Sequence, residues 1–323
     1  RHFVNFSIFI ISSIYFYKYL KLIFKNNSVL CFLGVIFLIT NPRIFAQSFY
    51  NPKDIIFLSL FIISNYYGLL FFNNTNFKNC FIFSIFSAAL ITTRTFGLVV
   101  PFIISIIFLV KIFKTKKIYY LRILIIFLIL LLFFSYVFWP YLWEDPLNRF
   151  LFIIKFFAEK SNNVEMLYFG KEILSTNLPW HYLVVYLTLS NPIYLIILFV
   201  LGIIKFFISL IKKKYEIYDF LYKFLVLIFF IFIPIILVVY LNTSLYNGWR
   251  HFYFLIPSII LFSLFFVKNL LKFNKLKYVK FIIIFIISIS YFNTINWMFK
   301  NHPYQYVYYN NVISPKPNLK YFS

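Results

Sequence analysis

Long apolar runs recur along the whole of this sequence and limit what it can fold into. A bilayer core about 30 Å thick needs roughly 20 apolar residues for each helix that crosses it. Of the 323 residues, 63% are hydrophobic and 25% aromatic, whereas soluble domains have about 45 to 50% apolar residues. The sequence therefore predicts an all-α, polytopic membrane protein and excludes a water-soluble globule.

Ten runs are candidate membrane spans, and together they form one transmembrane domain over residues 1–323. Two runs, 28–40 and 80–93, are short for a full crossing. We expect these two to be oblique, broken or shielded by neighbouring helices. The ten candidates are residues 3–24, 28–40, 55–72, 80–93, 96–110, 119–139, 191–211, 220–241, 252–268 and 280–298.

The net charge of +23 is more informative about orientation than about a nucleic-acid partner, which we do not expect. With the N-terminus outside, 19 of the 31 Lys and Arg residues fall in inside loops, and six of the eight acids fall outside. This is the distribution that the positive-inside rule predicts. The extracytoplasmic face is then the working face. It carries a long loop at about 140–190, where we expect short interfacial helices, and a C-terminal tail at about 299–323.

The densest polar signal is NPRIFAQSFYNPKDI, residues 41–55. Its two Asn-Pro steps predict a rigid turn, because proline restricts both itself and the residue before it. Arg43, Lys53 and Asp54 lie in this segment. Asp54 is expected to begin a helix at the membrane face, where its carboxylate serves as a base or positions a substrate hydroxyl. Alternatively, it only complements the helix dipole.

Two further basic sites lie close to apolar runs. Arg94, in ITTRTFGLVVP, has almost no polar cover, so it either pairs with an anion such as a phosphate or extends to the membrane surface. Arg250 and His251, in YNGWRHFYFLIP, lie among aromatic residues at the start of a span. They suit a lipid-linked anion or a sugar, or else they form a basic anchor in an aromatic belt.

Glu144 and Asp145, in WPYLWEDPLNRF, are the only adjacent acidic pair. Paired carboxylates bind a divalent cation, share acid and base roles, or contact a substrate. An acidic residue before Pro146 more often caps a surface turn or helix. No His and Cys metal pattern and no nucleotide-binding loop is present in the sequence, so we expect neither a metal nor another cofactor.

Four motifs, in this order, resemble one known family. They are NPRIFAQSFYNPKDI, LPWHYLVVYLTLSNPIYL at 178–195, GWRHFYFLIP at 248–257 and HPYQYVYYN at 302–310. The sequence resembles the bacterial glycosyltransferase family 39 proteins, which belong with protein mannosyltransferases and aminoarabinose transferases in the GT-C superfamily. The motifs cover nearly the whole chain.

The resemblance implies an integral enzyme of the bacterial inner (plasma) membrane, surrounded by membrane lipids. Such an enzyme passes a sugar, with inversion, from a polyprenyl-phosphate donor to a lipid, glycan or protein acceptor on the extracytoplasmic side. Asp54 matches the family's second acidic position and is the catalytic candidate. The candidates for substrate contacts are Arg43, Lys53, Arg94, Glu144, Asp145, Arg250 and His251.

The family's main catalytic acid lies in a loop that we expect to precede Arg1, so the sequence is expected to be a fragment without the first helix and loop. Two other functions stay open. One is a carrier or flippase for lipid-linked sugars, and the other is an oligosaccharide polymerase. A carrier is expected to show inverted repeats. The sequence shows no clear repeat, and its acids lie mostly on one face.

Overall fold

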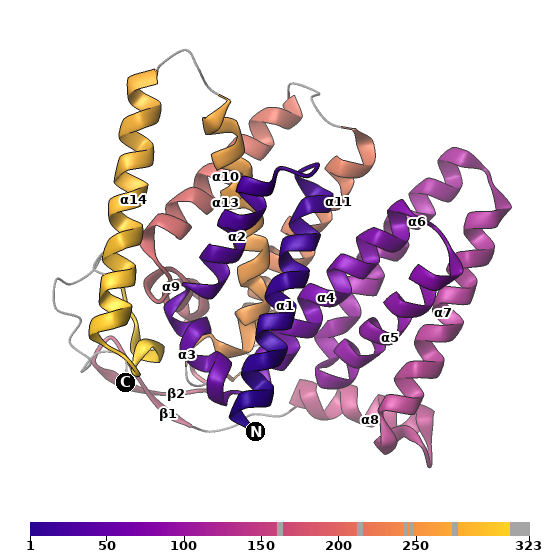
Figure 1. The fold of residues 1–323 in the computed structure, drawn as a ribbon. Coiled ribbons are helices and arrows are strands. Elements are labelled where there is room, and N and C mark those ends of the chain that lie inside the picture. Colours follow the sequence, from indigo (N-terminus) through magenta and orange to yellow (C-terminus); the bar gives the residue numbers. More distant parts are fainter. Residues whose placement is uncertain (160–163, 212–215, 242–243, 246–247, 273–276, 311–323) are drawn as a thin grey trace.

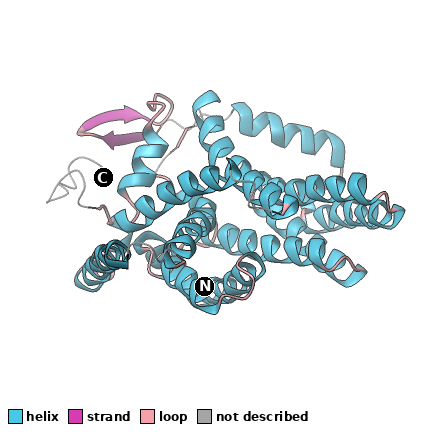
Figure 2. Cartoon of the chain, turned by 90° about the horizontal axis from the view of Figure 1, so that it is seen from above, coloured by secondary structure: helices cyan, strands magenta, loops and turns pink. Residues whose placement is uncertain are grey.

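The computed structural model describes residues 1–159, 164–211, 216–241, 244–245, 248–272 and 277–310. Within these ranges helices make up nearly all of the molecule, and a two-stranded hairpin lies at its edge (Figure 2). The α-helices are α1 His2–Ile23, α2 Ser28–Ile39, α3 Pro42–Tyr50, α4 Asp54–Asn73, α5 Phe77–Thr93, α6 Val99–Thr115, α7 Ile118–Phe138, α8 Pro146–Glu159, α9 Tyr182–Leu189, α10 Ile193–Ile211, α11 Ile217–Leu227, α12 Ile233–Tyr240, α13 Ile256–Leu271 and α14 Lys277–Lys300.

Short segments connect or extend these helices. The π-helical turn η3 (Ile228–Phe232) joins α11 to α12 in one continuous helix. The 3-10 segments η1 (Thr95–Leu98) and η4 (Arg250–Leu255) lead into α6 and α13. The remaining elements are the 3-10 segments η2 (Pro140–Leu142) and η5 (Gln305–Val307) and the strands β1 (Glu165–Tyr168) and β2 (Lys171–Leu174).

The chain is a helical membrane protein, because eight of its described helices are long and apolar enough to cross a bilayer. A ninth span results if α2 and α3, which are bent by 65° against each other, are counted together. The 17-residue α5 is a shorter apolar helix. The predicted count of ten spans holds only if the short segments 28–40 and 80–93 each cross the membrane. That these two segments cross stays a prediction.

The prediction of a turn over residues 41–55 is wrong for most of that segment, which forms the helix α3. Asn41 caps its start, because the side-chain oxygen accepts a hydrogen bond from the Ile44 amide at 3.4 Å. Pro42 occupies the first helical position, where a missing N–H costs nothing. The second step, Asn51-Pro52, lies between α3 and α4, because a residue before proline disfavours helical geometry.

The segment 140–190 contains α8 and α9, but it also contains a hairpin that an all-α prediction lacks. Strand β1 pairs antiparallel with β2, with Glu165 opposite Leu174 and Tyr168 opposite Lys171. Phe169 and Gly170 both have positive φ, 50° and 78°, as the favoured two-residue hairpin turn requires. Residues 160–163 of this loop, and residues 311–323 of the predicted tail, lie outside the described residues.

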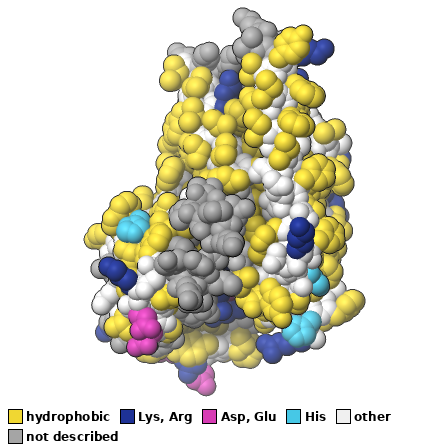
Figure 3. Space-filling model, turned by 90° about the vertical axis from the view of Figure 1, so that its left-hand side faces the viewer, with side chains coloured by type: hydrophobic (Ala, Val, Ile, Leu, Met, Phe, Trp, Pro, Cys, Tyr) yellow, Lys and Arg dark blue, Asp and Glu magenta, His cyan; other side chains and the backbone are white. Residues whose placement is uncertain are grey.

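The helices differ in how deeply they are buried and in the end of the bundle at which they begin. In their most apolar windows α4 and α13 are 67% and 72% buried, whereas α14 is 6% buried. Helices α3 and α8, the hairpin and the N-terminus lie at one end of the bundle (Figure 1). On the face in Figure 3, hydrophobic side chains cover the body, and the visible acidic side chains lie near this same end. Helices α4 and α13, the two most buried, also begin at this end. The charge pattern predicts this end to be extracytoplasmic.

Candidate functional site

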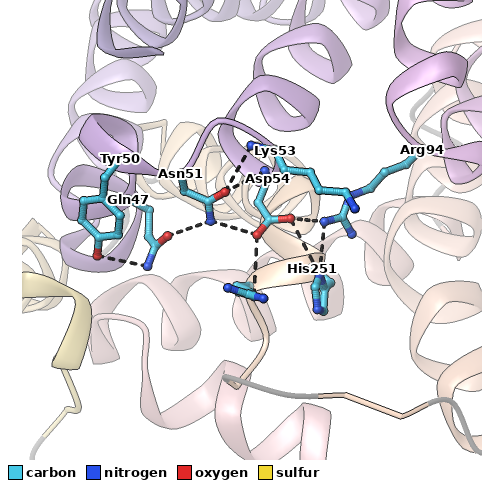
Figure 4. A network of polar contacts seen from close by, with 8 residues as sticks. Gln47, Tyr50, Asn51, Lys53, Asp54, Arg94 and His251 are labelled. Carbon is cyan, nitrogen blue, oxygen red and sulfur yellow. Dashed lines mark hydrogen bonds and ion pairs between the residues drawn. The ribbon is translucent and has the colours of Figure 1, made fainter. Parts of the chain in front are cut away.

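Asp54 is the first residue of α4 and is only 5% exposed. The Asn51 side chain holds it in two ways. Asn51 Nδ2 donates to Asp54 Oδ2 at 2.8 Å, and Asn51 Oδ1 accepts from the Asp54 amide at 3.0 Å. Asn51 Nδ2 also donates to Gln47 Oε1 at 2.7 Å, and Gln47 in turn donates to the Tyr50 hydroxyl at 3.2 Å (Figure 4). The last turn of α3 thus fixes the carboxylate at the start of α4.

Arg94 follows the last residue of α5 and forms an ion pair with Asp54 through Nη2 and Oδ1. Its backbone is extended, with φ −154° and ψ 134°, so the chain turns sharply into η1. Gly97 makes this turn possible, because a Cβ there would lie 2.8 Å from the backbone carbon and oxygen of Leu90. The guanidinium lies 5.7 Å from the ring centre of Phe57. The buried carboxylate of Asp54 compensates the charge of this arginine, which lies close to the apolar core.

Arg250 and His251 reach the same carboxylate from η4, which precedes α13. Arg250 Nε lies 3.9 Å from Asp54 Oδ2, and His251 Nδ1 lies 3.7 Å from Asp54 Oδ1. Arg94 Nη2 lies 3.1 Å from His251 Nδ1. Residues from α4, α5 and η4 thus meet at one acid.

A cavity of about 480 Å³ adjoins this group. Its lining includes Lys53, Arg94 and His251, together with the hydroxyl residues Thr92, Thr93, Thr95 and Ser244 and the aromatic residues Trp139 and Phe252. Asp54 is not among the lining residues. The cavity therefore presents cations and hydroxyl groups, a combination that suits an anionic, hydroxyl-rich ligand.

An apolar groove of about 700 Å³ continues from this cavity. The two share Thr95, Phe96 and Leu237. The groove runs between α6, α7 and the joined helix η3–α12, and its lining includes Leu98, Phe102, Leu128, Phe229 and Ile233. Leu98, Phe102 and Leu128 are 43 to 51% exposed, so the groove lies on the outer surface of the bundle. The part of η3–α12 that lines the groove, from residue 229 to residue 237, is about 12 Å long.

Arg43 is buried in a second group of side chains, and it lines neither this cavity nor the groove. Its Nε donates to the Tyr308 carbonyl at 3.2 Å, and its guanidinium lies 4.7 Å from the ring centre of Tyr309. The ring centres of Tyr309 and Tyr186 are 6.4 Å apart, and those of Tyr186 and Tyr168 are 6.0 Å apart. Through its contacts with Tyr308 and Tyr309, Arg43 joins α3 to the C-terminal segment. Burial raises the pKa of the nearby Tyr168 to about 12, so this phenol stays neutral.

Glu144 and Asp145 lie at the start of α8 and line neither the cavity nor the groove. Glu144 pairs with Arg149, and its side chain is 78% exposed. Asp145 accepts hydrogen bonds from the amide and the side chain of Asn148, at 3.3 and 2.8 Å. Asp145 therefore has the contacts of a helix cap.

Within the described part of the chain, no group of three or more His, Cys, Asp or Glu side chains could hold a metal ion. Sequence reasoning missed several residues of the site, notably Asn51, Trp139 and the threonines beside Arg94. The signal for the threonines is the run TTRT at 92–95, which is polar inside an apolar stretch.

No protein-family model, no curated protein and no solved structure matches this chain.

Proposed function

We propose that this protein is a membrane glycosyltransferase that takes a sugar from a polyprenyl-phosphate donor. The acceptor is a lipid, a glycan or a protein. This function combines the family resemblance of the four motifs with the chemistry of the site, and it requires one place for a charged phosphate and another for a long apolar chain.

The observation that carries the proposal is the continuity of the cation-lined cavity with the apolar groove. A polyprenyl-phosphate sugar has an anionic phosphate between a polar sugar and a hydrocarbon chain. Arg94, Lys53 and His251 suit the phosphate, and the hydroxyl-rich part of the cavity suits the sugar. The groove between α6, α7 and η3–α12 suits the hydrocarbon chain.

The reaction supported by this arrangement is an inverting substitution. The acceptor oxygen forms a bond to the anomeric carbon, while the bond from that carbon to the phosphate oxygen breaks. The electron pair of the broken bond stays on the polyprenyl phosphate, and the acceptor proton passes to a base. In this proposal Arg94, Lys53 and His251, which line the cavity, stabilise the charge that develops on the leaving phosphate.

The location of the reaction is part of the proposal. Basic residues concentrate in the loops at the end opposite the site, so we propose that the site faces the extracytoplasmic side of a bacterial plasma membrane. In the same proposal α8 and α9 lie at that membrane surface, and all ten apolar segments cross or enter the bilayer.

The test is a transfer assay on membranes that contain the full chain and a set of labelled polyprenyl-phosphate monosaccharides. We expect label to move from the polyprenyl-phosphate fraction to an acceptor with at least one donor. Arg94→Gln should lower this transfer by about 100-fold, as is typical when one preorganised charge-stabilising donor is lost. The matched control is Arg122→Gln, because Arg122 is an exposed arginine on α7. Movement of the labelled donor between leaflets without covalent transfer would instead indicate a carrier.

A further inference from the structure

We infer that Asp54 is a positioning residue, which holds Arg94 and His251 in the cavity wall, and that it is not the base that removes the acceptor proton. The inference rests on the proposed function and deepens it. It differs from the catalytic role that the sequence resemblance implies for Asp54, and it follows from the contacts of the carboxylate.

Both carboxylate oxygens of Asp54 are already engaged. Oδ1 is paired with Arg94, and Oδ2 accepts from Asn51 Nδ2 at 2.8 Å and lies 3.9 Å from Arg250 Nε. A base must bring a lone pair within hydrogen-bond reach of the hydroxyl proton that it removes. Asp54 is 5% exposed and does not line the cavity, whereas Arg94 and His251 do. The carboxylate therefore lies behind the basic side chains that face the cavity.

The charges around Asp54 give the carboxylate a structural task. Two guanidinium groups, those of Arg94 and Arg250, approach the carboxylate of Asp54. Like charges held this close in a partly buried site repel one another strongly. The carboxylate offsets this repulsion and allows both arginines to occupy the site.

The same carboxylate also bears on His251, whose Nδ1 lies 3.7 Å from Asp54 Oδ1 and 3.1 Å from Arg94 Nη2. Arg94 Nη2 contacts both Asp54 Oδ1 and His251 Nδ1 (Figure 4). On the other side of the carboxylate, Asn51 connects Asp54 to Gln47 of α3. A chain of contacts thus runs from α3 to the cavity wall. Second-layer contacts of this kind hold the groups that meet the substrate in a productive geometry.

A double-mutant cycle tests the inference on the purified full chain in lipid nanodiscs, with a labelled polyprenyl-phosphate sugar as donor. Asp54→Asn keeps the shape of the side chain and removes its charge. If Asp54 acts through Arg94, this change should lower kcat/KM for the donor by about 100-fold alone and by less than about 3-fold in an Arg94→Gln background. A base that acts independently would give the full loss in both backgrounds, which would overturn the inference.

Asn51→Ala provides a second test that leaves the Asp54 carboxylate in place. If Asp54 positions Arg94, loss of the Asn51 amide should raise the donor KM by about 10-fold. If Asp54 is the base, loss of the amide that holds its carboxylate should instead lower kcat and leave the donor KM close to that of the unaltered protein. This variant decides the matter if Asp54→Asn does not fold, as judged by size-exclusion chromatography and thermal unfolding.

The matched control is Glu216→Gln, because the Glu216 side chain is 80% exposed and pairs with Lys25 away from the cavity. Its activity should equal that of the unaltered protein. Binding of farnesyl phosphate is measured in parallel. If the unaltered protein neither transfers sugar nor binds farnesyl phosphate, the proposed function fails and this inference fails with it. If it transfers sugar but the losses in the cycle are additive, only the inference fails.

Discussion

Asp54 and Arg94 are separated by 40 residues, yet they form an ion pair between the first residue of α4 and the residue after α5. The pair joins two helices at the end of the bundle where His251 also arrives. Arg94 lines the cavity and Asp54 does not, so the two residues have different surroundings. The carboxylate contacts the guanidinium, and the guanidinium faces the cavity.

The groove should limit the hydrocarbon chain that the donor can carry. Ser105 of α6 lines the groove, and Ser105→Trp should fill part of it because an indole ring takes the place of a small hydroxymethyl group. We expect the KM for a long-chain polyprenyl donor to rise by about 10-fold, with a smaller rise for a short-chain donor. Steady-state transfer with both donors measures the difference. Leu109→Trp is the control, because Leu109 is 42% exposed on the same helix and does not line the groove. Equal effects at both positions would contradict the assignment of the groove.

Arg43 should contribute to stability through its contacts with the C-terminal segment. Arg43→Met removes the hydrogen bond to the Tyr308 carbonyl and the contact with the Tyr309 ring. A charged hydrogen bond and a buried cation–π contact together stabilise a protein by about 2 to 4 kcal/mol. We expect a lower thermal unfolding midpoint in detergent, whereas Arg122→Met should leave it unchanged. An unaltered midpoint for Arg43→Met would show that these contacts do not hold the segment.

Two glycines on helices should differ in their tolerance of a methyl group. A Cβ at Gly202 of α10 would lie 2.1 Å from the backbone oxygen of Phe262 in α13. At Gly34 of α2 the closest atoms are the ends of leucine side chains, at 2.4 and 2.8 Å, and these can rotate away. Gly202→Ala should therefore destabilise the protein by about 1 to 3 kcal/mol and Gly34→Ala by less. The yield of monodisperse protein after detergent extraction and its unfolding midpoint provide the comparison, and the reverse order would contradict the α10–α13 packing.

The orientation in the membrane can be tested with single cysteines, because the two native cysteines, Cys31 and Cys80, are buried. Lys171→Cys places a thiol on the hairpin, and Lys117→Cys places one in the turn before α7; both positions are exposed. A membrane-impermeant thiol reagent should label position 171 in intact cells and position 117 only after the cells are opened. The opposite pattern would reverse the face on which we propose that the reaction takes place.

The sequence alone determined the class of the fold and the start of some helices. Apolar runs of nearly bilayer length can satisfy their backbone groups in lipid only as helices, and all ten runs are helical in the structure. Asp54 does begin a helix, as its position before an apolar run predicts. Helix α3 and the hairpin were missed, because capping and positive-φ turns depend on local geometry that the hydrophobic pattern does not record.

Only the tertiary structure decided which polar residues meet. Arg94 and His251 are 157 residues apart, and their side chains touch because the end of α5 and the start of η4 both lie beside the start of α4. Arg43 is in the same motif as Asp54, but it points into a different group of side chains because α3 turns it toward the C-terminal segment. Apolar periodicity specifies that helices form but not how they pack. The composition of the site therefore follows from the contacts between helices.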